Sequence, residues 1–457
     1  MDKKIWIIVT GAFLSGFIQY MYHKLFLVHS FDYAVFLQTM QNICINGSMF
    51  NYVEYVGHGV TTHFAVHFQP ILYFYAFVYY VTKSVYVPDF FDWLGYVLLG
   101  VFTYKLYRDH KNILPMLLLW LISPVSYSFL YDAHPIVFAM PFGLLYMYAA
   151  ERKDRKLMLL SALALFTIKE DTALFPVAMG VYWIIEREWK ESLINFLVAG
   201  VMCITSVAVI LHFAGGRFVT SDHFGFDPNA FILALFVGGI ILVLAGAPFL
   251  YNKKQLRYYI VLTPLLIEPL TFKYWFTMQF GRQYYSFAIV GLIWVLSKVH
   301  FDKRKYLAAL VIISVVLSPV FDGIALIDGD NYNIHGVFLN YHANPIMLVK
   351  AYHDNYSEYE YLYTAVPSLM SSYKNEGYTV YLRRGLYEKF YTVMDVNFIN
   401  IFYNQSTPTP IVKYWSGMYI PTSGSLVESL GKCVLIVYET TFIPKIPCST
   451  YTVLPHH

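Results

Sequence analysis

Side chains capable of acid–base chemistry or of binding anions gather in a few short segments of the first 285 residues. They are Asp32, His63 and His67, Asp132 and His134, Lys169-Glu170-Asp171, and Arg282 beside Gln283. Carboxylates and imidazoles can accept or donate protons, and cationic groups can stabilise negative charge. In an apolar chain such residues usually mark a site or pair with one another.

Most of these segments also have a structural explanation. Asp32 precedes an amphipathic segment, where a carboxylate can cap the first helical turn. Asp132 can do the same for a helix beginning at Pro135. Lys169-Glu170-Asp171 can be a self-neutralising group in a broken helix. His134 has no comparable explanation, and together the segments favour function.

A divalent-metal site is an alternative use of the same histidines and acids. His63 and His67 stand four residues apart, the spacing that places two ligands on one helix face. Pro70 follows closely, and no other pair shows the compact spacing of a helical metal motif. The sequence therefore leaves open whether the protein binds a divalent metal.

The composition shows which elements must position these residues. The chain is 58% hydrophobic and 13% charged, whereas soluble domains are about 45–50% apolar and about 25% charged. A single soluble globule is therefore excluded. The formal charge of +3 does not indicate a nucleic-acid binder, and four cysteines are too few for a disulfide scaffold.

Apolar stretches predict a mostly α-helical, multi-pass membrane protein with about eleven spanning helices. The first, at 5–28, is expected to be an uncleaved anchor. The pair 157–169 and 172–186 is short for about 30 Å of hydrocarbon, so a re-entrant hairpin is the alternative. The remaining stretches are 90–107, 113–131, 135–150, 192–213, 228–250, 256–272, 283–298 and 305–323.

Basic residues predict the orientation. Eighteen of the Lys and Arg residues within 1–323 lie at the N-terminus or in alternate connections, and six lie elsewhere. The positive-inside rule then places the N-terminus in the cytoplasm of a cell-membrane protein. Residues 28–89 become a large first external loop, in which 69–83 is expected to be an interfacial or re-entrant helix.

The sequence changes character after residue 324. Residues 325–457 are polar and Tyr-rich, with strand-like runs at 378–382 and 433–438, which predicts a small extracytoplasmic α/β domain after a transmembrane domain at 1–324. Cys433 and Cys448 are either a disulfide or two free buried thiols. The external side also carries the glycosylation candidates Asn46, Asn355 and Asn404.

Four motifs in this order resemble the membrane-protein family catalogued as domain of unknown function 2079. They are Phe31-Asp32…Gln38, His67-Phe68-Gln69-Pro70, Asp132-Ala133-His134-Pro135 and Lys169-Glu170-Asp171. The match covers roughly residues 28–185 well and the later helices only generally. The chain departs at Ala34, Gln69 and Ala133, where the family tends to have Gly, Ser and Phe, without losing an ionisable group.

That family is related to the GT-C glycosyltransferases, and the resemblance implies sugar transfer from a polyprenyl-phosphate donor to an acceptor on the outer face. It implies that Asp32 deprotonates or orients the acceptor hydroxyl. Cations would stabilise the departing lipid phosphate, and acids would bind sugar hydroxyls, hold these cations or share a metal. The implied cations are Lys169, His134 and Arg282, the acids are Asp132, Glu170 and Asp171, and His63, His67 and Gln283 complete the substrate-binding set.

Two other classes remain open. A transporter or lipid flippase could use the same acids and histidines to relay protons or bind headgroups. A catalytically inactive member could be the scaffold of a surface complex. The expected partners are therefore membrane lipid, a lipid-linked sugar, a glycan or protein acceptor and a surface-complex protein, with no nucleic acid.

Overall fold

The protein is mostly helical. The computed structural model describes residues 2–24, 30–51, 54, 59–123, 134–219, 228–267, 285–314, 349, 353 and four strands after residue 378. The main α-helices are α1 (Lys3–Lys24), α2 (Ser30–Asn46), α4 (Ile71–Thr82), α5 (Val87–Tyr107), α6 (Ile113–Ile122), α7 (Pro135–Phe138), α8 (Met140–Glu151), α9 (Arg155–Ile168), α10 (Leu174–Ile185), α11 (Trp189–Phe213), α12 (Pro228–Leu244), α13 (Leu262–Leu265) and α15 (Ser286–Lys298). Residues 303–314 are also helical.

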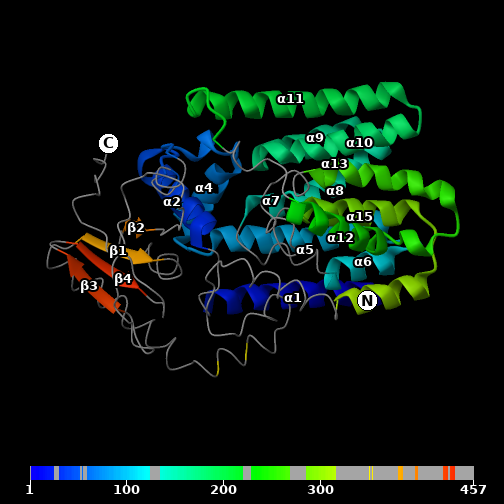
Figure 1. The fold of residues 1–457 in the computed structure, drawn as a ribbon, viewed down its shortest axis with the longest axis horizontal. Helices are drawn as coiled ribbons and strands as arrows, with labels where there is room; N and C mark the ends of the chain where they lie inside the picture. Colours follow the sequence, from blue (N-terminus) through cyan, green and yellow to red (C-terminus); the bar gives the residue numbers. More distant parts are fainter. Residues whose placement is uncertain are drawn as a thin grey trace.

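The helices form a bundle along the long axis of the molecule (Figure 1). Its central helix is α15, in which every residue from Ser286 to Leu296 is buried. A helix that is apolar on all sides belongs in such a core. At the edge, α11 turns Leu193, Leu197, Val201 and Ile204 outward, spaced along one helix face. This apolar outer face suits contact with lipid.

Two helices are long and apolar enough to cross a membrane by length and composition, α11 and the Lys3–Met21 part of α1. The consecutive helices α4 and α5 pass the same test together, with a bend of 117° between them, which would make a third span. The apolar helices at Ile113–Ile122, Pro135–Glu151 and Ser286–Lys298 are shorter. The described residues thus contain two or three candidate spans, and eleven crossings stay a prediction.

Two local expectations differ from the structure. Asp32 does not precede its helix, because α2 already begins at Ser30 and includes Asp32 in its first turn. The expected spanning helix at 256–272 is not one continuous α-helix in its described part. Residues Lys253–Val261 form the 3-10 helix η6, and the short α13 of four residues follows it.

The strand-like runs of the C-terminal region do form strands. The strands β1 (Thr379–Arg383), β2 (Asn397–Ile399), β3 (Leu426–Leu430) and β4 (Cys433–Val437) make one sheet in the order β2-β1-β4-β3. β1 is parallel to both neighbours, and β3 is antiparallel to β4. Cys433 begins β4, whereas Cys448, Asn355 and Asn404 lie outside the described residues. A separate external domain therefore stays a prediction.

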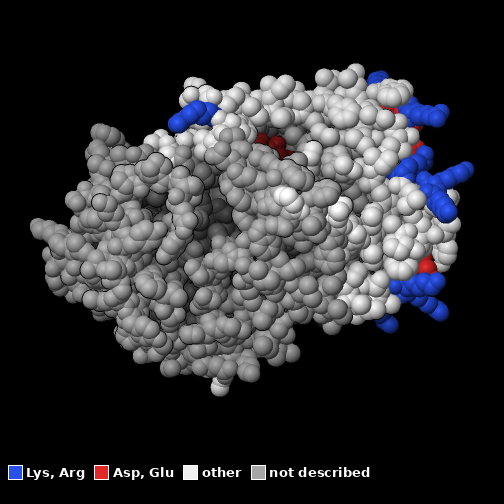
Figure 2. Space-filling model, viewed as in Figure 1, with Lys and Arg blue, Asp and Glu red and all other residues white. Residues whose placement is uncertain are grey.

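Basic connections meet at one end of the bundle. Figure 2 shows Lys and Arg concentrated at the end where α1 begins. Contacts between the basic connections hold them together at this end. In each contact a basic side chain binds a loop or helix end that is distant in sequence. They join Lys4 to the Arg108 carbonyl, Lys303 to the Lys111 carbonyl, Lys153 to Glu188, Arg257 to Glu186 and Lys298 to Glu151.

A close helix contact holds α7 against α5. A β-carbon at Gly95 would lie 2.7 Å from Phe138 Cα and 2.9 Å from the Val137 carbonyl oxygen. Only glycine therefore allows this approach. We expect Gly95→Ala to lower the free energy of unfolding by about 1–3 kcal/mol through overpacking. Gly200→Ala is the control, since a β-carbon there meets nothing within 4 Å; comparable losses in thermal melts of both variants would contradict the expectation.

Candidate functional site

The predicted site residues that the structure describes lie at the end of the bundle opposite the basic connections. The helix α9 begins at Arg155 on the basic side and ends at Ile168, directly before Lys169. The segment α7–α8 runs the other way, from His134 to Glu151. The segments 63–69, 134 and 169–171, far apart in sequence, therefore share one end.

A carboxylate–imidazole pair joins two of these segments. His67 Nδ1 lies 2.7 Å from Glu170 Oε1, and the Phe68 N–H donates to Glu170 Oε2 at 2.9 Å. The His67 and Glu170 side chains are 25% and 22% exposed. Glu170 thus fixes the ring of His67 through one nitrogen, the arrangement by which a carboxylate orients an imidazole for proton transfer.

Lys169 and Asp171 form a second charged pair beside the first. Lys169 Nζ lies 2.7 Å from Asp171 Oδ2, and these side chains are only 4% and 13% exposed. The sequence alternative of a self-neutralising tripeptide is therefore correct for Lys169 and Asp171. Glu170 is different, because its carboxylate bonds to the first loop instead.

His63 belongs to a buried network rather than to an open site. Its Nδ1 lies 2.6 Å from Glu54 Oε1, and its Nε2 lies 2.6 Å from Gln69 Oε1. The 3-10 helix η1 (His63–Ala65) places His63 and His67 close together, with ring centroids 5.8 Å apart. These hydrogen bonds hold the segment 63–69 in place, so His63 stabilises the position of His67.

Helix α7 begins at Pro135 as expected, but its N-cap residue is His134 and not Asp132, and the His134 side chain makes no capping hydrogen bond. Its backbone N–H donates to Asp92 Oδ2 on α5 at 2.6 Å. The ring of Phe36 on α2 contacts both His134 and His63 edge-on, with centroids 5.4 and 5.8 Å apart. Helix α2 therefore packs against the same cluster.

Asp32 is positioned by this packing of α2. Position 32 precedes Phe36 by four residues, and residues four apart lie on the same face of a helix. Since Phe36 contacts the cluster, position 32 lies on the helix face that carries that contact. Asp132, Arg282 and Gln283 lie outside the described residues, and Asn46 is the last residue of α2.

The surroundings of Glu170 and His134 determine the protonation state of each side chain at neutral pH. Burial raises the pKa of Glu170, but the charge and hydrogen bond of His67 outweigh it and lower the pKa to about 2. Burial, assisted by the nearby charge of Lys169, holds the pKa of His134 well below its usual range. Glu170 is therefore a carboxylate at neutral pH, and His134 is a neutral imidazole.

The lowered pKa of Glu170 predicts how stability depends on pH. A depressed carboxyl pKa stabilises the protein above the ordinary value of 4.5, and this contribution disappears as the pH falls from 4.5 toward 2. We expect it to be a few kcal/mol. Thermal melts of wild type and Glu170→Gln across this range test it. The gap between the two proteins should shrink on acidification, and a constant gap contradicts the expectation.

The described residues contain no group of three or more His, Cys, Asp or Glu side chains placed to hold a metal ion. The two histidines four residues apart instead take separate partners, Glu54 for His63 and Glu170 for His67. The described part of the cluster is thus a set of paired charges and hydrogen bonds.

Two important residues escaped the sequence reasoning. Asp92 lies in the predicted span 90–107, and a search for acids inside apolar stretches would have found it. Glu54 is a helical residue within the predicted first external loop, and nothing in the sequence marks it as the partner of His63. The structure adds both to the cluster.

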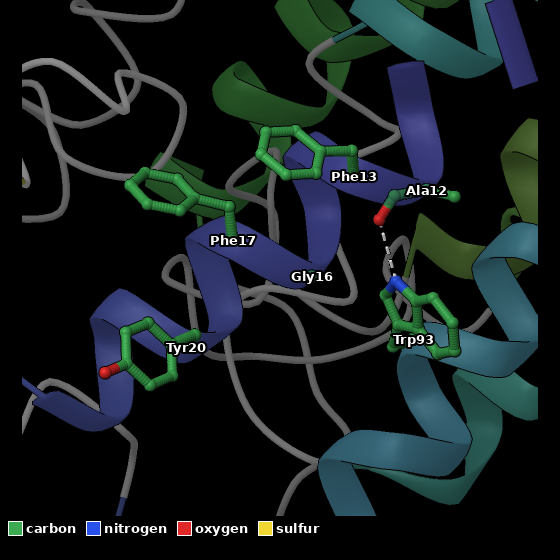
Figure 3. Close-up of a pocket in the computed structure, with 6 residues that line it drawn as sticks. All are labelled: Ala12, Phe13, Gly16, Phe17, Tyr20 and Trp93. Atoms are coloured by element: carbon green, nitrogen blue, oxygen red, sulfur yellow. Dashed lines mark hydrogen bonds between the residues drawn. The ribbon is translucent and has the colours of Figure 1, made fainter. Parts of the chain in front are cut away.

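A separate apolar groove lies along α1 (Figure 3). The lining residues are Ala12, Phe13, Gly16, Phe17 and Tyr20 of α1 and Trp93 of α5. Trp93 closes one side, and its indole N–H donates to the Ala12 carbonyl at 2.9 Å. The groove contains none of the predicted site residues, so it is distinct from the polar cluster.

Comparisons with known proteins identify the family. The family described as "Predicted membrane protein (DUF2079)" matches residues 22–297, which is more than half of the chain and includes every segment of the cluster. No curated protein matches the chain significantly, and neither does any solved structure. With this match, and with an apolar helical bundle that contains candidate spans, the chain belongs to the DUF2079 family of predicted membrane proteins.

Proposed function

We propose that the protein is a GT-C-like glycosyltransferase that moves a sugar from a polyprenyl-phosphate donor to an acceptor on the external face of the membrane. The observation that carries the proposal is the meeting of His67, His134 and Lys169-Glu170-Asp171 at the bundle end opposite the basic connections. Under the positive-inside rule that end is external.

The cluster offers groups suited to an anionic lipid substrate. Lys169 is a buried cation already aligned by Asp171, and His67 is aligned by Glu170. Such preoriented donors stabilise the negative charge that gathers on a departing phosphate. In this proposal Lys169 and His67 bind the phosphate, with Arg282 and Gln283 completing the binding set.

The transfer step needs a base for the acceptor hydroxyl. Asp32 is the proposed base, on the α2 face that contacts the cluster. The acceptor oxygen forms the new bond to the anomeric carbon and gives its proton to Asp32. The bond between that carbon and the phosphate oxygen breaks, and its electron pair leaves with the lipid phosphate. Asp132 and Glu170 hold sugar hydroxyls or the cations.

The test uses the full-length protein in liposomes. Polyprenyl-phosphate-linked hexoses are supplied one at a time with cell-envelope glycan or protein, and native mass spectrometry follows binding of the unsubstituted polyprenyl phosphate. We expect binding of the lipid phosphate and release of it from at least one donor. Movement of the lipid between leaflets without release indicates a flippase. Absence of both, with a stoichiometric protein partner, indicates a scaffold.

A further inference from the structure

Asp92 is a fully buried acid within an apolar helix, directly behind the candidate site. Its Oδ2 accepts the backbone N–H of His134 at 2.6 Å, while its Oδ1 has no hydrogen-bond partner. A carboxylate usually satisfies both oxygens, and a buried oxygen left unpaired is costly. One side of this carboxyl group therefore requires an explanation.

Two other buried polar atoms near Asp92 are also unpartnered. The Tyr75 hydroxyl on α4 is fully buried, lies within electrostatic reach of Asp92 and makes no hydrogen bond. Its ring stacks on Phe91 of α5 with centroids 4.3 Å apart. His134 Nδ1 is the third such atom. Helices α4 and α5 and the start of α7 thus each carry one buried, unsatisfied polar atom.

No described cation neutralises a charge on Asp92. The groups that act on it are the His134 N–H, which favours the carboxylate, and Asp89 one turn earlier, which opposes it. Asp89 itself accepts the Tyr33 hydroxyl hydrogen at 2.6 Å. Around His134 the charged groups are Lys169, His63 and His67, none of which pairs with Asp92. An ionised Asp92 would face desolvation and a like-charged neighbour.

We propose that Asp92 carries a proton in the resting protein, and that Asp92, Tyr75 and His134 form a buried proton-binding site behind the His67–Glu170 pair. The neutral carboxyl group needs one acceptor for its O–H. The Tyr75 oxygen and the neutral imidazole of His134 can both accept, and because neither is hydrogen-bonded to Oδ1 directly, a bridging water would complete the link. Passing the proton to His134 breaks the Asp92 O–H bond and forms an N–H bond. The electron pair stays on the carboxylate, so total charge is conserved.

This site is independent of sugar transfer, because it concerns the resting protein without substrate. Infrared spectroscopy of the protein in lipid nanodiscs, in H₂O and D₂O at neutral pH, tests it directly. We expect a protonated-carboxyl C=O band that shifts in D₂O and is lost in Asp92→Asn. The asparagine keeps an oxygen for the His134 N–H. Asp89→Asn, one helical turn away, is the matched control and should retain the band.

Tyr75→Phe gives a second measurement if Asp92→Asn folds poorly. Removing the hydroxyl leaves the ring stacked on Phe91, so the Asp92 band should persist at a shifted frequency. An unshifted band in Tyr75→Phe would remove Tyr75 from the site. A wild-type spectrum in which no protonated-carboxyl band depends on Asp92 would overturn the proposal.

Discussion

Replacing Asp32 with asparagine should lower sugar transfer by about 10²–10⁴-fold, the usual contribution of a general base. The amide has nearly the same shape but cannot take the proton of the acceptor hydroxyl. Asp32 lies in the first turn of α2, so the substitution should leave folding nearly intact. Release of polyprenyl phosphate by equal amounts of folded wild-type and variant protein measures the effect.

The matched control is Asp109→Asn at the basic end. The Asp109 side chain is 91% exposed and pairs with the neighbouring Arg108, so this variant should transfer sugar at the wild-type rate. A folded Asp32→Asn protein with full activity would exclude Asp32 as the base. Retained binding of polyprenyl phosphate in Asp32→Asn would show that only the chemical step is affected.

Replacing Lys169 with methionine should cause the largest loss of stability. Lys169 and Asp171 are a close, largely buried pair, and removing one partner leaves a buried charge without compensation. The expected loss in the free energy of unfolding is about 3–5 kcal/mol. Binding of polyprenyl phosphate should weaken as well, because the buried cation is removed. Thermal unfolding in detergent, with and without the lipid phosphate, measures both effects.

Lys153→Met is the comparison for a surface pair. Lys153 and Glu188 are 42% and 50% exposed, and such pairs contribute about 0–1 kcal/mol. A double-mutant cycle of Lys169→Met with Asp171→Asn then separates the interaction free energy of the pair from the cost of leaving Asp171 as an unpaired buried charge. If Lys169→Met costs no more than Lys153→Met, the buried pair does not stabilise the protein as described.

The sequence predicts helices well where long apolar runs identify them. The expected span 192–213 corresponds to α11 at Trp189–Phe213, and 90–107 corresponds to α5 at Val87–Tyr107. Helix starts are harder, because they depend on local capping. The first helical residue is Ser30 rather than one after Asp32, and the 3-10 helix η6 occupies the start of the expected span at 256–272.

The partners within the candidate site could not be predicted from local patterns. His67 and Glu170 are 103 residues apart, and only the packing of the helices brings them together. Spacing alone left open a metal site at His63 and His67, and it could not indicate that Glu54 lies 2.6 Å from His63. The sequence identified the ionisable segments, while tertiary contacts determined their pairing.

If α9 crosses the membrane as the sequence predicts, its length sets how deep the charged tripeptide would lie. A helix of 14 residues spans about 21 Å, whereas the hydrocarbon layer is about 30 Å thick. If Arg155 marks the cytoplasmic boundary, Lys169 lies roughly 9 Å inside the opposite boundary. In the proposed reaction a lipid headgroup would then have to descend below the level of its neighbours to reach Lys169, which would make the local thickness of the bilayer a determinant of substrate access.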